Sequence, residues 1–118
     1  MANYAHLRVE KRGDVVVIYL LDNRIVAELA IASLGDELYA VTDRPDCMKL
    51  VLNFAAVEYL SSAMLGKLIT LRRKMGVRKA ALVLCEIRPE ILTIFKLTSL
   101  DRILDIRATE ADAVAACG

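Results

Sequence analysis

The stretch Lys49-Leu-Val-Leu-Asn-Phe-Ala-Ala-Val-Glu-Tyr-Leu-Ser-Ser-Ala-Met-Leu-Gly66 decides how this chain folds. Its first six residues are mostly apolar, as in a short strand that is covered on both faces. From Ser61 or Ser62 onward, apolar residues recur at the spacing of one helical face. The predicted buried stripe comprises Leu65, Leu68, Ile69 and Met75, widened by Met64 and Leu71. The stretch therefore predicts a buried strand followed by a helix that begins at two adjacent serines and stops at Gly76.

Two strands and a helix are predicted before this unit. Leu7–Lys11 alternates apolar and polar residues, Val15–Leu21 is nearly all apolar, and Gly13-Asp14 between them is a hairpin signal. A helix follows, because its apolar residues are spaced by four and three positions. This stripe comprises Ala27, Ile31, Leu34, Leu38 and Val41. We expect Asp22 or Asn23 to cap this helix, and Arg44–Cys47 to form a turn.

The downstream sequence continues the alternation of strands and helices. Ala80–Cys85 is a third buried strand, and Pro89 suits the first turn of a third helix. Ile91, Ile94 and Phe95 would face inward from that helix. A short edge strand within Ile103–Arg107 and a capped helix beginning at Thr109 complete the chain. The order predicts an α/β fold with a mixed, mostly parallel central sheet of about four strands plus an N-terminal strand, flanked by about four helices.

Length and composition exclude several classes of protein. A chain of 118 residues is expected to form one domain, residues 1–118. Hydrophobic residues make up 57% and charged residues 26%, which excludes an intrinsically disordered chain, and only 5% are aromatic, so the core must be mainly aliphatic. A net charge of +1 argues against nucleic acid or an anionic membrane as a direct partner. No uncharged apolar run is long enough to span a bilayer.

The cysteines favour a reducing compartment and no metal centre. Cys47, Cys85 and Cys117 are odd in number and widely spaced, and the N-terminal residues lack the layout of a signal peptide. We therefore expect a cytoplasmic protein without disulfides. His6 is the only histidine and no close cysteine pair exists, so neither a metal nor a cofactor is expected. Cys47 is interpreted as part of a polar turn, and Cys117 as part of the terminal tail.

Few residues in the sequence support the hypothesis of a catalytic function. Glycine-rich phosphate loops, dinucleotide fingerprints and nucleophile elbows are all missing. A thiol pair of Cys85 with His6 and a carboxylate pair of Glu86 with Glu90 stay open as alternatives, although burial and a helix-start charge cluster explain these residues more simply. One basic group could suggest RNA, but no aromatic residues interleave it, which favours a solvated helix end. Its members are Lys67, Arg72, Arg73, Lys74, Arg78 and Lys79.

The two adjacent serines are the feature that points to function. A serine at a helix start caps free backbone N–H groups, which explains one of them. The second hydroxyl is left over, and we expect it to be exposed. The pair also follows the carboxyl end of a central strand, where α/β folds place ligand and partner surfaces.

The run Val51-Leu-Asn-Phe-Ala-Ala-Val-Glu-Tyr-Leu-Ser-Ser-Ala-Met-Leu-Gly-Lys-Leu68 resembles the signature of the STAS family of anti-sigma factor antagonists. Further similar motifs follow in Leu84–Ile91, Phe95–Ile103 and Thr109–Ala113, so the resemblance covers roughly Leu7 to Ala116. It implies the family's four-stranded sheet with an extra N-terminal strand. It also implies a regulator that is not an enzyme and whose bacterial partner is an anti-sigma factor with serine kinase activity.

The resemblance assigns roles to the residues at the predicted helix start. Aligning Leu65-Gly66 with the family's Asp-Ser-Ser/Thr-Gly-Leu-Gly run places Ser62 on the phosphorylated serine. Ser61 then replaces the Asp, Ala63 the second hydroxyl residue and Met64 the Gly. The expected partner-binding residues are Ser61, Ser62, Ala63 and Met64, with Asp22, Asn23 and Arg24 from the preceding loop.

The resemblance implies a partner-switching regulator, which binds its partner when unphosphorylated and releases it on phosphorylation of Ser62. We expect Met64 to project an apolar side chain near this site. The alternative is an unswitched interaction or scaffold module, with or without a small ligand, whose serines only cap the helix. A homodimer also stays open.

Overall fold

A five-stranded sheet runs through the computed structural model, which describes residues 4–118. Its strands lie in the order β1-β2-β4-β6-β7, and only the β1–β2 pair is antiparallel. The strands are β1 (Leu7–Arg12), β2 (Val15–Leu20), β4 (Lys49–Asn53), β6 (Ala81–Cys85) and β7 (Asp105–Arg107). The helices are α1 (Glu28–Thr42), α2 (Ser62–Val77), α3 (Pro89–Leu97) and α4 (Glu110–Cys117), with a 3₁₀ helix, η1, at Leu100–Arg102. The predicted fold class is confirmed.

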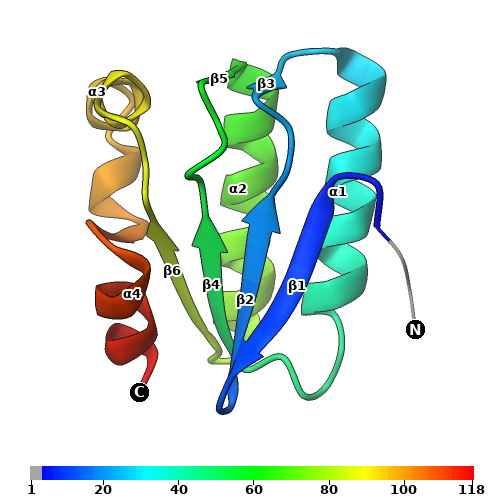
Figure 1. The fold of residues 1–118 in the computed structure, drawn as a ribbon, viewed down its shortest axis with the longest axis vertical. Coiled ribbons are helices and arrows are strands. Elements are labelled where there is room, and N and C mark those ends of the chain that lie inside the picture. The colour runs from blue at the N-terminus through cyan, green and yellow to red at the C-terminus, as the bar shows by residue number, and fades with distance from the viewer. Residues whose placement is uncertain (1–3) are drawn as a thin grey trace.

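The central strand β4 shows why the sheet is covered on both faces. Leu50 and Leu52 belong to the larger core, which also contains buried residues of α1, α2 and α3, whereas Val51 belongs to a smaller core with residues of α4. Side chains alternate between the two faces of a strand, so an apolar run needs cover on both. Figure 1 accordingly shows α1 and α2 behind the sheet and α4 in front of it.

The parallel strands bring their carboxyl ends to one edge of the sheet. β2, β4 and β6 all end at this edge, which is the upper one in Figure 1, while the Gly13-Asp14 turn lies at the lower end. The segment after β4 therefore reaches the upper edge before α2 begins and returns along the sheet. This topology places the predicted serine pair at the carboxyl edge.

A second, two-stranded sheet at this edge was not predicted. β3 (Arg24–Ile25) pairs in parallel with β5 (Tyr59–Leu60). The Asn23 carbonyl accepts backbone hydrogen bonds from Glu58 and Tyr59 at 2.7 and 3.1 Å. The Ser61 N–H donates to the Ile25 carbonyl at 2.9 Å. The loop after β2 is thus attached directly to the segment that enters α2.

Two helix-boundary predictions were wrong. The N-cap of α1 is Ala27, in extended conformation and without a side-chain cap, rather than Asp22 or Asn23. The loop before α1 first pairs with β5, so the two polar residues lie too far from the helix start to cap it. Gly76 does not end α2, which continues to Val77 and is followed by Arg78 as the C-cap.

The structure refines the interpretation of two cysteines. Cys47 closes the predicted turn, because its N–H donates to the Arg44 carbonyl at 3.0 Å, but its side chain is buried in the larger core with only 1% of its surface exposed. Cys117 does not lie in a terminal tail, since it is the last residue of α4 and is buried in the smaller core. Both thiols are therefore packing residues.

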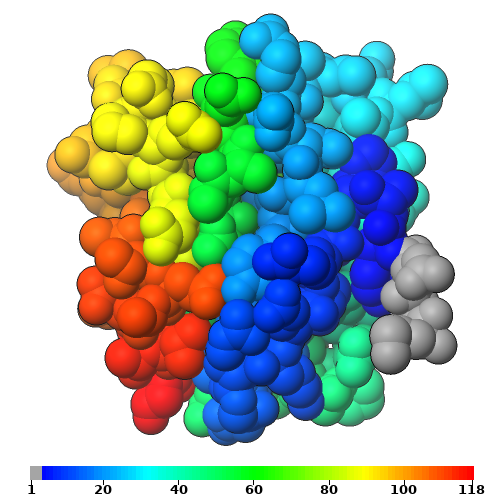
Figure 2. All heavy atoms as spheres, viewed as in Figure 1, coloured from blue at the N-terminus to red at the C-terminus, as the bar shows by residue number. Residues whose placement is uncertain are grey.

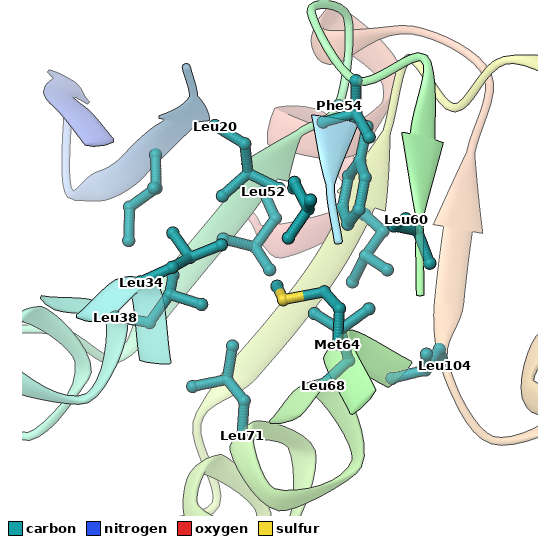
Figure 3. Close-up of a cluster of buried hydrophobic side chains, with 14 of the residues drawn as sticks. Leu20, Leu34, Leu38, Leu52, Phe54, Leu60, Met64, Leu68, Leu71 and Leu104 are labelled. Atoms are coloured by element: carbon teal, nitrogen blue, oxygen red, sulfur yellow. The ribbon is translucent and has the colours of Figure 1, made fainter. Parts of the chain in front are cut away.

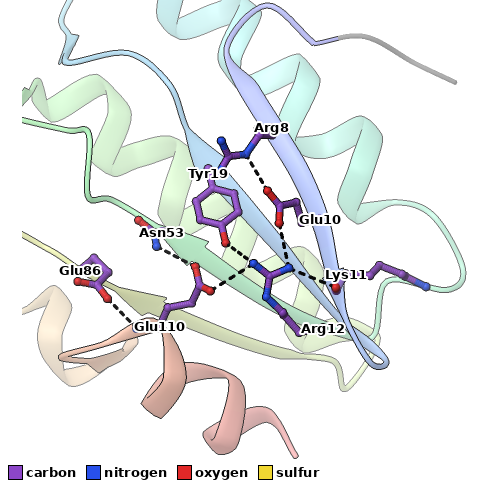
Figure 4. Close-up of polar contacts among 8 residues, drawn as sticks. All are labelled: Arg8, Glu10, Lys11, Arg12, Tyr19, Asn53, Glu86 and Glu110. Carbon is purple, nitrogen blue, oxygen red and sulfur yellow. Dashed lines mark hydrogen bonds and ion pairs between the residues drawn. The ribbon is translucent and has the colours of Figure 1, made fainter.

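Helix α4 is tied to the sheet by polar contacts at its start. The Glu110 N–H donates to Glu86 Oε2 at 2.8 Å, and Glu110 Oε1 accepts from Asn53 Nδ2 at 3.0 Å. Arg12 lies on the same face, where it hydrogen-bonds the Tyr19 hydroxyl at 2.9 Å (Figure 4).

Across residues 4–118, no helix combines the length and apolar character needed to cross a bilayer.

Candidate functional site

Ser62 occupies the first turn of α2, and its side chain is exposed. Ser61 precedes it as the N-cap, in extended conformation at φ −90° and ψ 166°. The amides of Met64 and Leu65 both donate to the Ser61 carbonyl, at 3.1 and 3.4 Å. The first backbone N–H groups of a helix have no intrahelical acceptor, and they point toward its N-terminal end. An exposed hydroxyl thus lies where a helix favours negative charge.

The Ser61 hydroxyl does not perform the capping role that a serine at this position normally has. Its oxygen makes no side-chain cap hydrogen bond to α2. The same oxygen is buried and has no hydrogen-bond partner among the described residues. The expectation that one serine caps the helix was therefore wrong for the N-cap residue Ser61, whereas the expected exposed hydroxyl is that of Ser62.

The expectation that Met64 projects an apolar side chain near this site was wrong, whereas its predicted place in the buried stripe of the helix is confirmed. Met64 is fully buried, and its thioether packs in the larger core near Leu52 and Leu68 (Figure 3). It cannot project toward a partner in this conformation. Ala63, by contrast, is exposed beside Ser62. The accessible face of the helix start consequently consists of small side chains, with the Ser62 hydroxyl as its polar group.

The predicted loop Asp22–Arg24 lies beside the serine pair, as the β3–β5 pairing requires. Asn23 and Arg24 are exposed, and the Arg24 guanidinium lies 5.2 Å from the centre of the Tyr59 ring. Asp22 is half-buried, and its carboxylate is 2.6 Å from His6 Nδ1. Asp22 therefore fixes the base of the loop, while Arg24 presents a cation at the surface.

Exposed apolar side chains surround this edge. Leu29 has 85% of its surface exposed, which is unusual for a large apolar residue in a helix. The space-filling view shows the segments around β3 and β5 side by side at the surface (Figure 2). We call the following set the carboxyl-edge patch: Leu21, Val26, Leu29, Tyr59 and Ser62. Its apolar members could not be predicted from the sequence, because exposed apolar residues that are scattered along the chain have no distinguishing pattern.

Asn53 is a second residue that the sequence analysis missed. It is buried at the end of β4, where its Oδ1 accepts from the Ala55 N–H at 2.8 Å. Its Nδ2 donates to Glu110, so the side chain joins the loop before β5 to α4. An amide at the end of an otherwise apolar strand was the available signal, since a buried polar side chain needs partners.

The structure does not support either catalytic pair that the sequence left open. His6 precedes β1 and Cys85 ends β6, and two strands lie between them, which separates them by about 14 Å. Burial, followed by the negative charge of Glu86, raises the pKa of the Cys85 thiol to about 12. Glu86 accepts the Glu110 N–H, whereas Glu90 is exposed in the first turn of α3. No group of three or more potential metal ligands occurs within residues 4–118.

Comparison with known proteins agrees with this architecture. The model of the STAS domain family matches residues 6–113, nearly the whole chain. The chain belongs to the STAS domain family. A solved anti-sigma factor antagonist from Mycobacterium paratuberculosis is 25% identical, with a TM-score of 0.81 and coverage of 94% of this chain and 92% of that chain.

Two further solved proteins share the fold at lower identity. An anti-sigma-factor antagonist domain protein from Planctomyces limnophilus is 18% identical, with a TM-score of 0.83 and coverage of 95% and 97%. The Bacillus cell fate determinant SpoIIAA, solved in its phosphorylated form, is 17% identical, with a TM-score of 0.69 and coverage of 93% and 97%. This STAS domain thus has anti-sigma factor antagonists as structural neighbours.

Proposed function

We propose that this STAS domain is a partner-switching regulator of the anti-sigma factor antagonist type. Its unphosphorylated carboxyl-edge patch binds an anti-sigma factor with serine kinase activity, and phosphorylation of Ser62 releases that partner. The chain acts by binding and not by catalysis. The exposed Ser62 side chain at the N-terminus of a 16-residue helix is the observation that carries the proposal.

The position of Ser62 explains how the fold tolerates a phosphate. A phosphoserine carries about −1.5 to −2 charges and three acceptor oxygens. Free N–H groups and the helix dipole favour negative charge at this end of α2. Because Ser62 is already exposed, its phosphate needs no rearrangement of the core. We therefore expect phosphorylation to change the surface and leave the fold intact.

The same phosphate opposes binding at the carboxyl-edge patch. A partner that packs on Leu29, Tyr59 and the Ser62 hydroxyl would have to desolvate a dianion in place of a small neutral group. A loss of about 3 kcal/mol weakens a complex more than a hundredfold. Release thus follows from a local change in charge.

The departures from the family motif are compatible with this mechanism. Met64 replaces the motif's glycine, but its side chain lies in the core and does not cover Ser62. Ser61 replaces the aspartate without making a cap hydrogen bond. Ser61 also gives no support to the alternative of an unswitched module, whose serines would serve only as caps.

The test uses candidate anti-sigma kinases with the full chain. Intact-mass analysis after incubation with ATP should find one added phosphate, and fragmentation of the phosphorylated peptide should locate it on Ser62. Ser62→Asp should weaken partner binding about a hundredfold, whereas Ser62→Ala should bind as wild type does. Ser99→Asp is a matched control, because Ser99 is exposed and its φ of 62° suits Asp. Wild-type affinity of Ser62→Asp for a partner that does bind wild type would refute switching at this serine.

A further inference from the structure

The far end of α2 carries an uneven distribution of charge. Between Tyr59 and Cys85 the sequence has six Lys or Arg residues and no Asp or Glu, while the rest of the chain has ten cations against all 15 acids. A net charge near zero therefore conceals a strongly basic segment. Most of these cations lie in the last turns of α2 and just after it, opposite the end that carries Ser62 (Figure 1).

Several of these cations are used within the fold or half-buried, and two exposed ones remain for a partner. Lys74 pairs with Asp43 at 3.4 Å, and the Arg78 guanidinium donates to carbonyls of the α1–β4 turn. Arg73 and Lys79 are exposed and take part in no ion pair within residues 4–118. Arg72 contacts the Ile103 carbonyl through Nε and is also exposed.

A groove of about 240 Å³ lies beside these cations, between α2 and the segment that leads to β7. Its apolar lining includes Met75, Leu82 and Leu104, and Arg72 lies at its edge. The Asp105 carboxylate also lines it but is bound by Arg107, at 2.7 and 3.3 Å. Exposed apolar side chains continue the surface, because Val77 is 81% and Ile103 43% exposed.

We propose that this α2-end groove, lined by Arg72, Met75 and Leu104 and flanked in the sequence by Arg73, Val77 and Lys79, docks an acidic segment of a partner protein through one apolar anchor residue. The groove is smaller than the roughly 300–1,000 Å³ typical of small-molecule sites, and suits a single side chain. Acidic residues on either side of the anchor would meet Arg73 and Lys79, which gives charge complementarity.

Other anionic partners fit this surface less well. A membrane surface is flat, and its apolar interior cannot enter a recessed groove, whereas a peptide side chain can. Single-stranded nucleic acid binds on aromatic platforms, and no aromatic side chain lines this groove among the described residues. The apolar floor beside a basic rim therefore selects an acidic, amphipathic peptide.

Binding at the α2-end groove is expected to be independent of the phosphorylation of Ser62. Arg73 lies about 16 Å from Ser62 along the axis of α2 and Lys79 lies beyond the end of the helix, so both are at least about twice the Debye length of about 8 Å away at physiological salt. A phosphate on Ser62 would thus be screened from Arg73 and Lys79. The acidic segment should bind both forms of the protein, so one partner can be held while the partner at the carboxyl-edge patch is exchanged.

The experiment follows amide NMR spectra of the full chain during titration with a blocked synthetic peptide, Glu-Glu-Leu-Glu-Glu. Saturable shifts are expected at Gly76, Val77 and Leu104. They should weaken when Ser replaces the Leu of the peptide, and disappear when Lys replaces every Glu. Ser62→Asp should bind the peptide with unchanged affinity, which separates this proposal from the switching function.

Two double variants test which positive charges of the protein bind the peptide. Arg73→Glu combined with Lys79→Asn should raise the dissociation constant about tenfold. Asn is chosen because Lys79 has a φ of 57°. Lys96→Glu combined with Arg88→Asn makes the same change in charge at exposed positions of α3 and its N-cap, outside the groove lining, and should have no effect. Any of three results would overturn the proposal. These are the absence of saturable shifts, equal weakening of peptide binding by both double variants, and tighter binding to phosphatidylserine vesicles or to oligouridylate than to the peptide.

Discussion

At the scale of single residues, Ser61 is unusual because its hydroxyl occupies an N-cap without capping. Replacing an N-cap serine by alanine normally costs about 1 kcal/mol. Here the hydroxyl oxygen is buried and has no partner among the described residues, so its removal ends an uncompensated desolvation. We expect Ser61→Ala to leave the free energy of unfolding unchanged or to raise it by up to about 1 kcal/mol. Urea denaturation measures this change.

Thr109 is the matched control for that prediction. Its hydroxyl caps α4 by accepting the Asp112 N–H at 3.1 Å. Thr109→Ala should therefore lower the free energy of unfolding by about 1 kcal/mol, as ordinary cap removal does. A similar loss in Ser61→Ala would show that the Ser61 hydroxyl does cap α2 in solution.

At the scale of elements, Asn53 connects the end of β4 to the loop that enters α2. Asn53→Ala removes the acceptor of the Ala55 N–H and the donor to Glu110. We expect a loss of about 2 kcal/mol in the free energy of unfolding, because two partly buried hydrogen bonds are broken. The Ala55 amide should also exchange with solvent faster relative to global unfolding.

Asn23→Ala is the control for this change. Asn23 contributes its backbone carbonyl to the β3–β5 pairing, and its side chain is exposed. The substitution should shift the free energy of unfolding by less than about 0.5 kcal/mol. An equal loss in both variants would mean that Asn53 does not organise the loop.

Elements with long apolar runs or a clear helical period could be predicted from the sequence, whereas the two-residue strands could not. The apolar runs of β2, β4 and β6 predicted central strands, because only a covered sheet buries such runs on both faces. Two-residue strands have no detectable period, so β3 and β5 were missed. These short strands are held by backbone hydrogen bonds, such as that from Ser61 to Ile25, which depend on no side-chain type.

The site was predictable to the extent that it depends on topology. Ser62 and the Asp22–Arg24 loop follow the carboxyl ends of neighbouring parallel strands, and the structure brings them together. The burial of Met64 was predictable from its place in the buried stripe of the helix, and the structure confirms it. The expectation that it projects near Ser62 came from the comparison with the family motif alone, in which a glycine occupies this position.

At the scale of the whole molecule, both cores contain thiols, and their burial gives the fold a measurable response to alkali. Burial raises the pKa of the Cys85 thiol to about 12, and it also raises the pKa of Cys47 and of Cys117. An unfolded thiol ionises near its ordinary pKa of about 8.5. Above this pH the unfolded chain releases the Cys85 proton while the folded chain retains it, so rising pH favours unfolding. The stabilisation is complete below about pH 8.5 and is lost progressively up to about pH 12.

A comparison of wild type with Cys85→Ala isolates this effect, because the Lys and Tyr titrations are common to both proteins. Wild type should be the more stable at about pH 8, where alanine leaves a small cavity in the core. Its advantage should shrink above about pH 9, by at most about 1.4 kcal/mol per pH unit. Urea denaturation at a series of pH values measures the difference. A constant difference up to about pH 11 would mean that the Cys85 thiol is accessible to water in the folded protein.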